Sequence, residues 1–286
     1  TEIFRIAPTT VPLELDLNMF YSETDLSHVK AQSNGVRSGY YSAAFLLQRT
    51  LADRLDIDPT EIEIADISMK FLDDGTNRRI AEIILTDELP NGSGFVRYLF
   101  DNFNSILSET IKPSVADSYL DKIHSKTHRQ NCEDACYDCL KVFRNMNYHS
   151  LLDWRLGLSM LRVMNDSTFS CGTDGNFNFV ELESWLGFAE KLRDSFFLSF
   201  YQNSQSARRE EINGLPIIKF GRNQKNIILI VHPFWDLKNI REANWLAEVK
   251  AEAEEHIAQS GGIISIIDTF NLHRRPGYCY ENLVKR

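Results

Sequence analysis

The stretch that organises this chain is HSKTHRQNCEDACYDCL, residues 124–140. It contains three of the five cysteines and two of the seven histidines of the sequence. Within it, the four residues of an H-x3-C-x3-C-x2-C pattern are His128, Cys132, Cys136 and Cys139. A tetrahedral zinc site needs four nitrogen or sulfur donors at about 2.0–2.3 Å from the ion. The pattern therefore predicts a closed, structural zinc site.

Other interpretations of the same stretch remain open. The C-x2-C pair could be redox-active, but such pairs follow a strand and open a helix in a βαβ unit, which the surrounding pattern does not show. The thiols could also merely pack in a core. Clustered cysteines in a reducing interior favour a metal over disulfides. The identity of the fourth ligand stays open, because His124, His149 and Cys171 compete with His128.

Length and composition describe an ordinary globular protein. A hydrophobic share of 43% and a charged share of 25% are typical, and 286 residues suffice for one large domain or two smaller ones. No apolar run reaches the roughly 18 residues of a membrane span, so we expect no membrane partner and a cytoplasmic location. The net charge of −9 argues against a wholly basic nucleic-acid-binding surface but permits a local basic groove. Because residue 1 is Thr and no leader follows, we interpret the chain as a fragment.

The chain before the cysteine stretch alternates between helical and strand patterns. Apolar residues at helical spacing predict two helices, the second of which ends before Pro113. Two isoleucine-rich segments flank Asp73-Asp74-Gly75, a turn sequence that predicts a β-hairpin. The expected elements are helices over 42–55 and 95–111, strands over 61–71 and 79–85, and a further strand around 13–17.

The chain after the cysteine stretch becomes a mixture of helices and strands. We expect helices over 150–163, 181–200 and 240–260, and strands over 215–220, 226–231 and 263–267. Gly261-Gly262 caps the last helix, and strand–helix–strand at this spacing predicts a right-handed parallel crossover. The predicted fold class is mixed α/β, with a zinc-clasped helical segment between a hairpin-containing part and a C-terminal βαβ-type sheet. The corresponding domains are 1–120, 121–165 and 166–286.

Several segments resemble one protein family. The most specific is CEDACYDCL with its follower LLDWRLGL, which is similar to the C-terminal zinc-binding region of MrfA-like DEAD/DEAH-box helicases, some of which act in phage defence. Many members carry a further cysteine two residues before the first of the trio, where this chain has Gln130, so His128 becomes the natural substitute. The matching segments are Cys132–Leu140, Leu151–Leu158, Arg37–Ile64, Asp87–Phe95, Val231–Asp236 and Asp268–Pro276.

The resemblance implies a region of an ATP-dependent DNA helicase whose motor precedes it. This chain has no G-x4-G-K-[ST] loop to hold nucleotide phosphates, so ATP would bind only in a motor region outside it, in cis or in trans. We therefore expect a non-catalytic zinc-binding region that stabilises the protein and guides nucleic acid or partner contacts. The alternative is a stand-alone interaction subunit of a phage-defence helicase complex.

Further candidate residues concern DNA and hydrolysis. Tyr148 or Trp154 could stack on bases, although a Trp on a helix is more often part of the core. His232 and Asp268 end two predicted neighbouring strands, where ligands often gather, so a nuclease or hydrolase is a second alternative. Candidate nucleic-acid contacts are Arg78, Arg79, Arg129, Arg144, Arg274 and Arg275.

Overall fold

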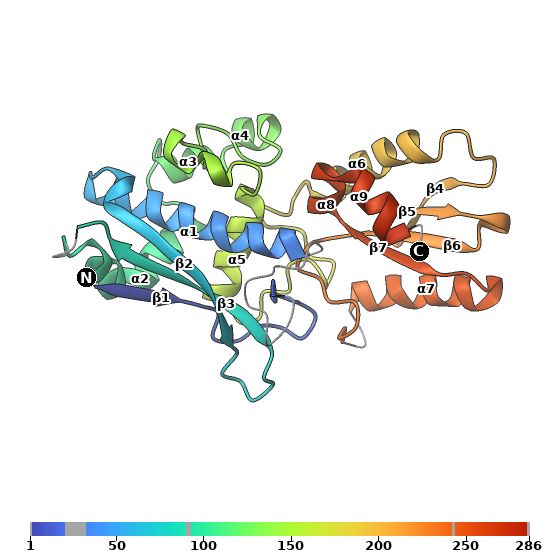
Figure 1. Cartoon of the computed structure of the whole chain (residues 1–286), viewed down its shortest axis with the longest axis horizontal. Helices are drawn as coiled ribbons and strands as arrows, with labels where there is room; N and C mark the ends of the chain where they lie inside the picture. The colour runs from blue at the N-terminus through green and yellow to red at the C-terminus, as the bar shows by residue number, and fades with distance from the viewer. Residues whose placement is uncertain (1, 21–32, 90–92, 242–243, 285–286) are drawn as a thin grey trace. The chain divides into compact units, whose positions relative to one another are not determined.

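The computed structural model describes residues 2–20, 33–89, 93–241 and 244–284. The chain divides into two compact units, one formed by Thr1–Pro12 with Leu17–Phe169, the other by Leu13–Asp16 with Ser170–Arg286. Both contain helices and a sheet, so the predicted mixed α/β class is confirmed (Figure 1). The cysteine stretch belongs to the first unit. None of the described helices combines the length and the apolar character needed to cross a bilayer.

The first unit contains a three-stranded antiparallel sheet. β2 (Ile62–Phe71) and β3 (Arg79–Asp87) form the predicted hairpin. β1 (Ile3–Ile6) pairs with the other edge of β3, which gives the strand order β1-β3-β2. The central strand β3 is the most deeply buried of the three, as expected for a strand with neighbours on both sides.

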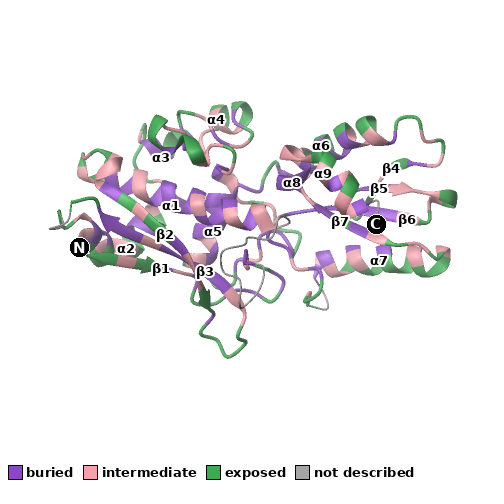
Figure 2. Ribbon diagram, in the orientation of Figure 1, coloured by how far each residue is buried: buried purple, intermediate pink, exposed green. Residues whose placement is uncertain are grey.

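Three helices pack with this sheet to form the core of the first unit. They are α1 (Asn34–Leu55), α2 (Phe95–Ile111) and α5 (Trp154–Asn165). Most of α1 is buried, as the long purple stretch in Figure 2 shows. α5 approaches α1 closely at Gly157, where a Cβ atom would lie only 2.8 Å from Ser42 Cβ. The Ser42 hydroxyl also accepts a 2.8 Å hydrogen bond from the Asp153 amide, which fixes the start of α5 against α1.

Shorter elements connect the helices of the first unit. The 3-10 helix η2 (Pro59–Glu61) leads from α1 into β2. The segment between α2 and α5 contains α3 (Tyr119–His124), α4 (Lys126–Asn131), the cysteine loop and the 3-10 helix η3 (Phe143–Tyr148). Ser118 and Ser125 cap α3 and α4, respectively, by accepting backbone N–H groups, so both short helices begin at serines that sequence rules favour.

The second unit contains a four-stranded mixed sheet in the order β4-β5-β6-β7. The first three strands form an antiparallel meander, and β7 pairs with β6 in parallel. The predicted parallel crossover is therefore confirmed, with α7 (Trp245–Ser260) as its connecting helix. The strands are β4 (Arg208–Ile212), β5 (Leu215–Phe220), β6 (Asn226–Val231) and β7 (Ile264–Asp268).

Helices cover both faces of the second sheet. In Figure 1, α7 runs along one side, and α6 (Trp185–Phe200), α8 (Thr269–Arg274) and α9 (Pro276–Cys279) lie on the other. This arrangement explains why β6 is buried from Ile227 to Val231 and reads as a continuous apolar run rather than an alternating one. The 3-10 helix η4 (Arg222–Gln224) links β5 to β6, and the π-helix η5 (Tyr280–Val284) follows α9.

One expected strand is absent, and two strands were missed. The segment 13–17 forms only an isolated bridge between Leu15 and Trp235, because the Asp16 amide and the Glu14 carbonyl bond to the loop after β6. Two strands were not predicted, namely β1 and β4. β4 has the sequence RREEI and is an edge strand with mostly exposed side chains, so it carries no apolar alternation.

Candidate metal centre

Four side chains gather at the end of α4 and in the loop after it. The potential ligand atoms of His128, Cys132, Cys136 and Cys139 all lie within 4.8 Å of one another. Cys132 and Cys139 are buried, and His128 and Cys136 are half-buried. The structure thus brings together the four residues of the H-x3-C-x3-C-x2-C pattern as one cluster.

Local hydrogen bonds place each member of the cluster. His128 lies in α4. The last turn of this helix is closed by a hydrogen bond from the Cys132 amide to the His128 carbonyl at 2.8 Å. The helix does not continue to Cys136. Instead, Cys136 opens a tight turn in which its carbonyl accepts from the Cys139 amide at 3.2 Å and its own amide donates to Cys139 Sγ at 3.0 Å. This turn aims both thiols of the C-x2-C pair in one direction.

The distances within the cluster fit a tetrahedral ion. Sulfur ligands at 2.3 Å from zinc lie about 3.8 Å apart, and a sulfur and an imidazole nitrogen lie about 3.6 Å apart. Cys136 Sγ is 3.6 Å from Cys139 Sγ, Cys132 Sγ is 3.9 Å from Cys139 Sγ, and Cys136 Sγ is 3.6 Å from His128 Nε2. A disulfide would require about 2.05 Å, and these cysteines are free thiols.

The imidazole of His128 is oriented for ligation through one nitrogen. Its Nδ1 lies 2.8 Å from the Ile123 carbonyl, which can only accept, so Nδ1 carries the proton. Nε2 therefore holds the lone pair, and it is the nitrogen that faces Cys136. A second hydrogen bond that fixes the tautomer is the usual companion of a metal-bound histidine.

The start of α5 supports the cysteine loop. Trp154 is fully buried, its ring centroid lies 5.2 Å from that of His128, and its Nε1 donates to the Cys132 carbonyl at 3.2 Å. The Arg155 guanidinium donates to three carbonyls, those of Cys132 at 3.0 Å, Glu133 at 2.7 Å and Arg129 at 3.1 Å. The core interpretation of Trp154 is thus confirmed, and its ring is not available to stack on bases.

The three thiols differ in acidity. A hydrogen bond from Cys132, with help from His128 and the Cys136 amide, lowers the pKa of Cys139. The hydrogen bond to Cys139 and burial raise the pKa of Cys132, and burial beside Cys139 raises the pKa of Cys136. Zinc ligation requires ionised thiols, and a divalent cation stabilises neighbouring thiols in that form.

The competitors for the fourth ligand position have other partners. His124 Nε2 lies 3.1 Å from the Thr110 carbonyl, and burial lowers the pKa of His124 to about 4. His149 Nε2 lies 3.0 Å from the Val142 carbonyl. Cys171 belongs to the second unit. Of the candidates, His128 is the one in the cluster, and it is the histidine that the H-x3-C-x3-C-x2-C spacing favoured.

The six candidate arginines for nucleic-acid contacts do not share one environment. Arg78 donates to the Pro12 carbonyl at 3.0 Å and pairs with Asp74 at 3.5 Å, which are contacts that hold the β2–β3 loop. In the second unit, Arg274 and Arg275 each place their guanidinium over an aromatic ring, at 4.1 and 4.6 Å. Five of the six are half-buried, namely Arg78, Arg79, Arg129, Arg274 and Arg275.

Arg144 differs from the other five because it is exposed. Hydrogen bonds from Thr60 lower the pKa of Asp58, and the charges of Arg144 and Arg49 add to this effect. Arg144 thus lies within electrostatic range of α1 and the loop after it. It remains available for a ligand at the surface.

His232 directly follows β6 and Asp268 is the last residue of β7, so both lie at the carboxyl ends of the two parallel strands, as predicted. Burial lowers the pKa of His232 to about 3, and His232 Nδ1 accepts from the Phe234 amide at 3.2 Å. Burial raises the pKa of Asp268, which caps α8 by accepting from the Asn271 amide at 2.8 Å and from its side-chain amide at 2.6 Å. Cys171 Sγ lies 3.5 Å from His232. These contacts are those of a structural core.

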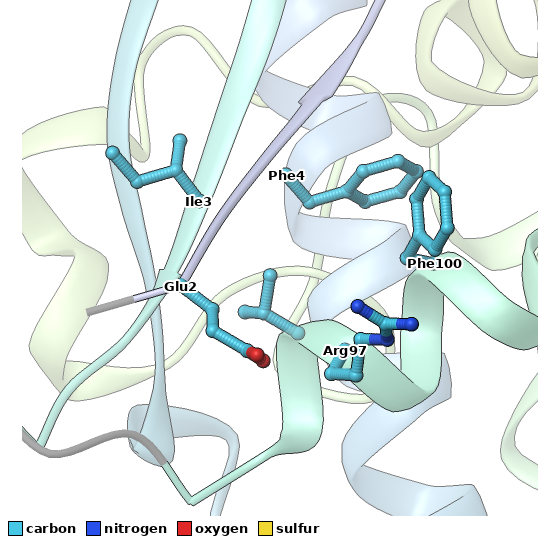
Figure 3. A pocket seen from close by; sticks show the side chains of 6 residues that line it. Glu2, Ile3, Phe4, Arg97 and Phe100 are labelled. Atoms are coloured by element: carbon cyan, nitrogen blue, oxygen red, sulfur yellow. The ribbon is translucent and has the colours of Figure 1, made fainter.

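A shallow pocket of about 260 Å³ lies between β1 and α2 in the first unit (Figure 3). Its apolar wall includes Phe4 and Phe100, whose rings meet edge to face at 5.6 Å. Glu2 and Arg97 supply its charged groups. The pocket therefore lacks the cysteine, histidine and paired carboxylate groups of a metal or hydrolytic site.

Comparison with known proteins agrees with the geometry of the cluster. Residues 43–140 match the MrfA Zn-binding domain. The matched range is less than half of the chain, but it contains all four residues of the cluster. The Druantia protein DruE of Escherichia coli (strain UMEA 4076-1) is 28% identical over 109 residues. That alignment covers 38% of this chain and 5% of the Druantia protein, so it spans a small part of the relative. No solved structure matches the chain significantly.

Proposed function

We propose that this chain is a non-catalytic, zinc-binding region of a DEAD/DEAH-box-type ATP-dependent DNA helicase. The zinc ligands are Cys132, Cys136, Cys139 and His128 Nε2. The observation that carries the proposal is the convergence of these four donor atoms within 4.8 Å, inside the range that matches the MrfA Zn-binding domain. A Cys₃His set is a common ligand set of structural zinc.

A structural role follows from the number and origin of the ligands. Four protein ligands fill a tetrahedral sphere and leave no open position for a substrate or a reactive water. The ligands come from α4 and the cysteine loop, and Arg155 and Trp154 bind that loop to α5. Zinc in small modules contributes folding free energy on the order of 10 kcal/mol. The ion would therefore hold α4 and the loop against the core of the first unit.

The identity of the parent protein rests on similarity. The resemblance to MrfA-like helicases and the alignment with a Druantia protein favour a helicase-type protein of phage defence. ATP would then be hydrolysed by a motor region in cis or in trans. A stand-alone interaction subunit that recruits such a motor is the second candidate. His232 is buried and accepts from the Phe234 amide, and Asp268 is half-buried and caps α8, so neither supports hydrolysis by this chain.

Metal analysis of the purified chain tests the zinc part of the proposal. We expect one zinc per chain by mass spectrometry, and substitution of Cys132, Cys136 or Cys139 by Ser should each abolish it. Cys279→Ser is the matched control, because Cys279 is an equally buried thiol in the second unit and should leave the zinc content unchanged. A folded chain that binds no metal would refute the proposal.

The helicase part is tested on the natural protein. The gene that contains this segment should encode a G-x4-G-K-[ST] motor, and the protein should unwind DNA in the presence of ATP. A motor on a separate chain that co-purifies with this one would favour the interaction subunit instead. A natural protein with neither would contradict both.

A further inference from the structure

In the segment between the cysteine loop and α5, a polar side chain is buried while neighbouring apolar side chains are exposed. Asn145 is 4% exposed, whereas its neighbours Phe143 and Met146 are 79% and 53% exposed. The buried amide is hydrogen-bonded on both sides: Asn145 donates to the Leu140 carbonyl at 2.8 Å and accepts from the Val142 amide at 2.9 Å. η3 is kinked at Asn145, whose φ of −106° and ψ of 22° are not helical, and Phe143 and Met146 lie on either side of this kink. Folding alone would favour the opposite arrangement.

The exposed aromatic surface extends beyond η3. Tyr137 is 71% exposed, and its ring packs edge to face on His149 at 5.8 Å. His149 in turn contacts the Val142 carbonyl, directly before Phe143. Tyr137 and Phe143 are the two most exposed of the large hydrophobic side chains in the described part of the chain. We call Tyr137, Phe143 and Met146 the aromatic shelf.

A stacked pair of half-buried rings, with a guanidinium beside it, joins η3 to α1. Tyr148, the last residue of η3, stacks on Tyr41 with centroids 4.9 Å apart and planes at 30°. The Arg37 guanidinium lies 5.4 Å from the centroid of Tyr41. The region therefore already shows the ring-on-ring and cation–π geometry with which aromatic side chains bind unpaired bases.

η3 and the residues next to it in 141–149 carry positive charge. Residues 141–149 contain two cations, Lys141 and Arg144, and no carboxylate. Arg144 is exposed next to Phe143. The preceding cysteine loop is acidic: Glu133 and Asp138 are exposed, and Asp134 lies 3.9 Å from Lys141. A surface of flat rings with an adjacent guanidinium fits single-stranded nucleic acid, since a duplex hides the faces of its bases.

We propose that the aromatic shelf binds single-stranded DNA. Bases stack on Phe143 and Tyr137, and Arg144 contacts a phosphate. The inference rests on the proposed function, because a strand that leaves a helicase motor is single-stranded. The zinc site, which holds the loop that carries Tyr137, keeps the shelf rigid.

Fluorescence anisotropy with a fluorescein-labelled oligothymidylate tests this inference. Phe143→Ala and Tyr137→Ala should each weaken binding roughly 5- to 100-fold, as expected for the loss of one base stack. Phe143→Trp should retain binding. Phe100→Ala is the matched control, because Phe100 is also an exposed phenylalanine of the first unit, 58% exposed, but lies in the pocket between β1 and α2. A duplex of the same length should bind more weakly than the single strand.

Zinc content distinguishes a failure of this inference from a failure of the proposed function. All of these variants should keep one zinc per chain. A zinc-loaded wild-type chain that does not bind the oligonucleotide, or a Phe143→Ala variant that binds it as the wild type does, would overturn the inference and leave the zinc site intact. Loss of association with the motor protein in Phe143→Ala, with no DNA binding by the wild type, would assign the shelf to a protein partner and also overturn it.

Discussion

Replacing Gly157 by Ala should destabilise the first unit, although the same change usually stabilises a helix. Alanine gains about 1 kcal/mol over glycine in a helix interior. At Gly157, however, the added Cβ would lie 2.8 Å from Ser42 Cβ, 2.9 Å from the Ser42 carbonyl carbon and 2.9 Å from Leu46 Cδ1. Ser42 Cβ adjoins the backbone of α1 and the carbonyl carbon belongs to it, so α1 and α5 must move apart. Overpacking of this kind costs about 1–3 kcal/mol, which leaves a net loss of up to about 2 kcal/mol.

Gly187→Ala in α6 is the matched control for this prediction. No atom lies within 4 Å of the Cβ that it would add, so only the gain in helix propensity, about 0.5–1 kcal/mol, should appear. Urea unfolding followed by circular dichroism, with zinc present throughout, gives both values. The two substitutions should change the free energy of unfolding in opposite directions. An equal stabilisation by both would show that α1 and α5 do not approach as closely as described.

Two further predictions concern the support of the cysteine loop and the buried histidine. Arg155→Lys keeps the charge but cannot reach three carbonyls at once, so zinc affinity measured by chelator competition should fall about 10- to 100-fold; an unchanged affinity would refute the role given to Arg155. Because burial lowers the pKa of His232 from 6.5 to about 3, the unfolded chain binds a proton in this range that the folded chain does not. The contribution of His232 to the free energy of unfolding is therefore fully present above pH 6.5. It should fall by up to about 1.4 kcal/mol per pH unit as the pH decreases toward 3. His232→Asn should reduce this pH dependence of the free energy of unfolding, and an unchanged slope would contradict the assignment.

The sequence predicted correctly those elements that are determined by local interactions. The crossover β6–α7–β7 follows from two apolar runs separated by a helix that ends at Gly261, whose φ of 68° suits a glycine cap. The helix α2 is bounded as predicted, since Lys112 and Pro113 follow its last residue. The cysteine spacing similarly identified Cys136 and Cys139, because the C-x2-C turn is a local structure.

Long-range contacts determined what the sequence could not reveal. β1 has only four residues, and it becomes a strand because β3 offers it a paired edge. The spacing favoured His128 but did not exclude His124, because the carbonyls of Ile123 and Thr110, which orient the two rings differently, are contacts that spacing does not show. The burial of Asn145 between exposed apolar side chains could not be predicted from the sequence either. A short segment that contains Phe, Met and Asn does not indicate which of these side chains face the core.

X-ray absorption at the zinc edge of the purified chain tests the central claim most directly. We expect a single zinc with three sulfur neighbours at about 2.3 Å and one nitrogen neighbour at about 2.0–2.1 Å, with the scattering pattern of an imidazole. Loss of the imidazole signal in His128→Ala should identify the nitrogen ligand. A spectrum with fewer sulfurs, with oxygen neighbours in their place, or with no zinc at all would contradict the account.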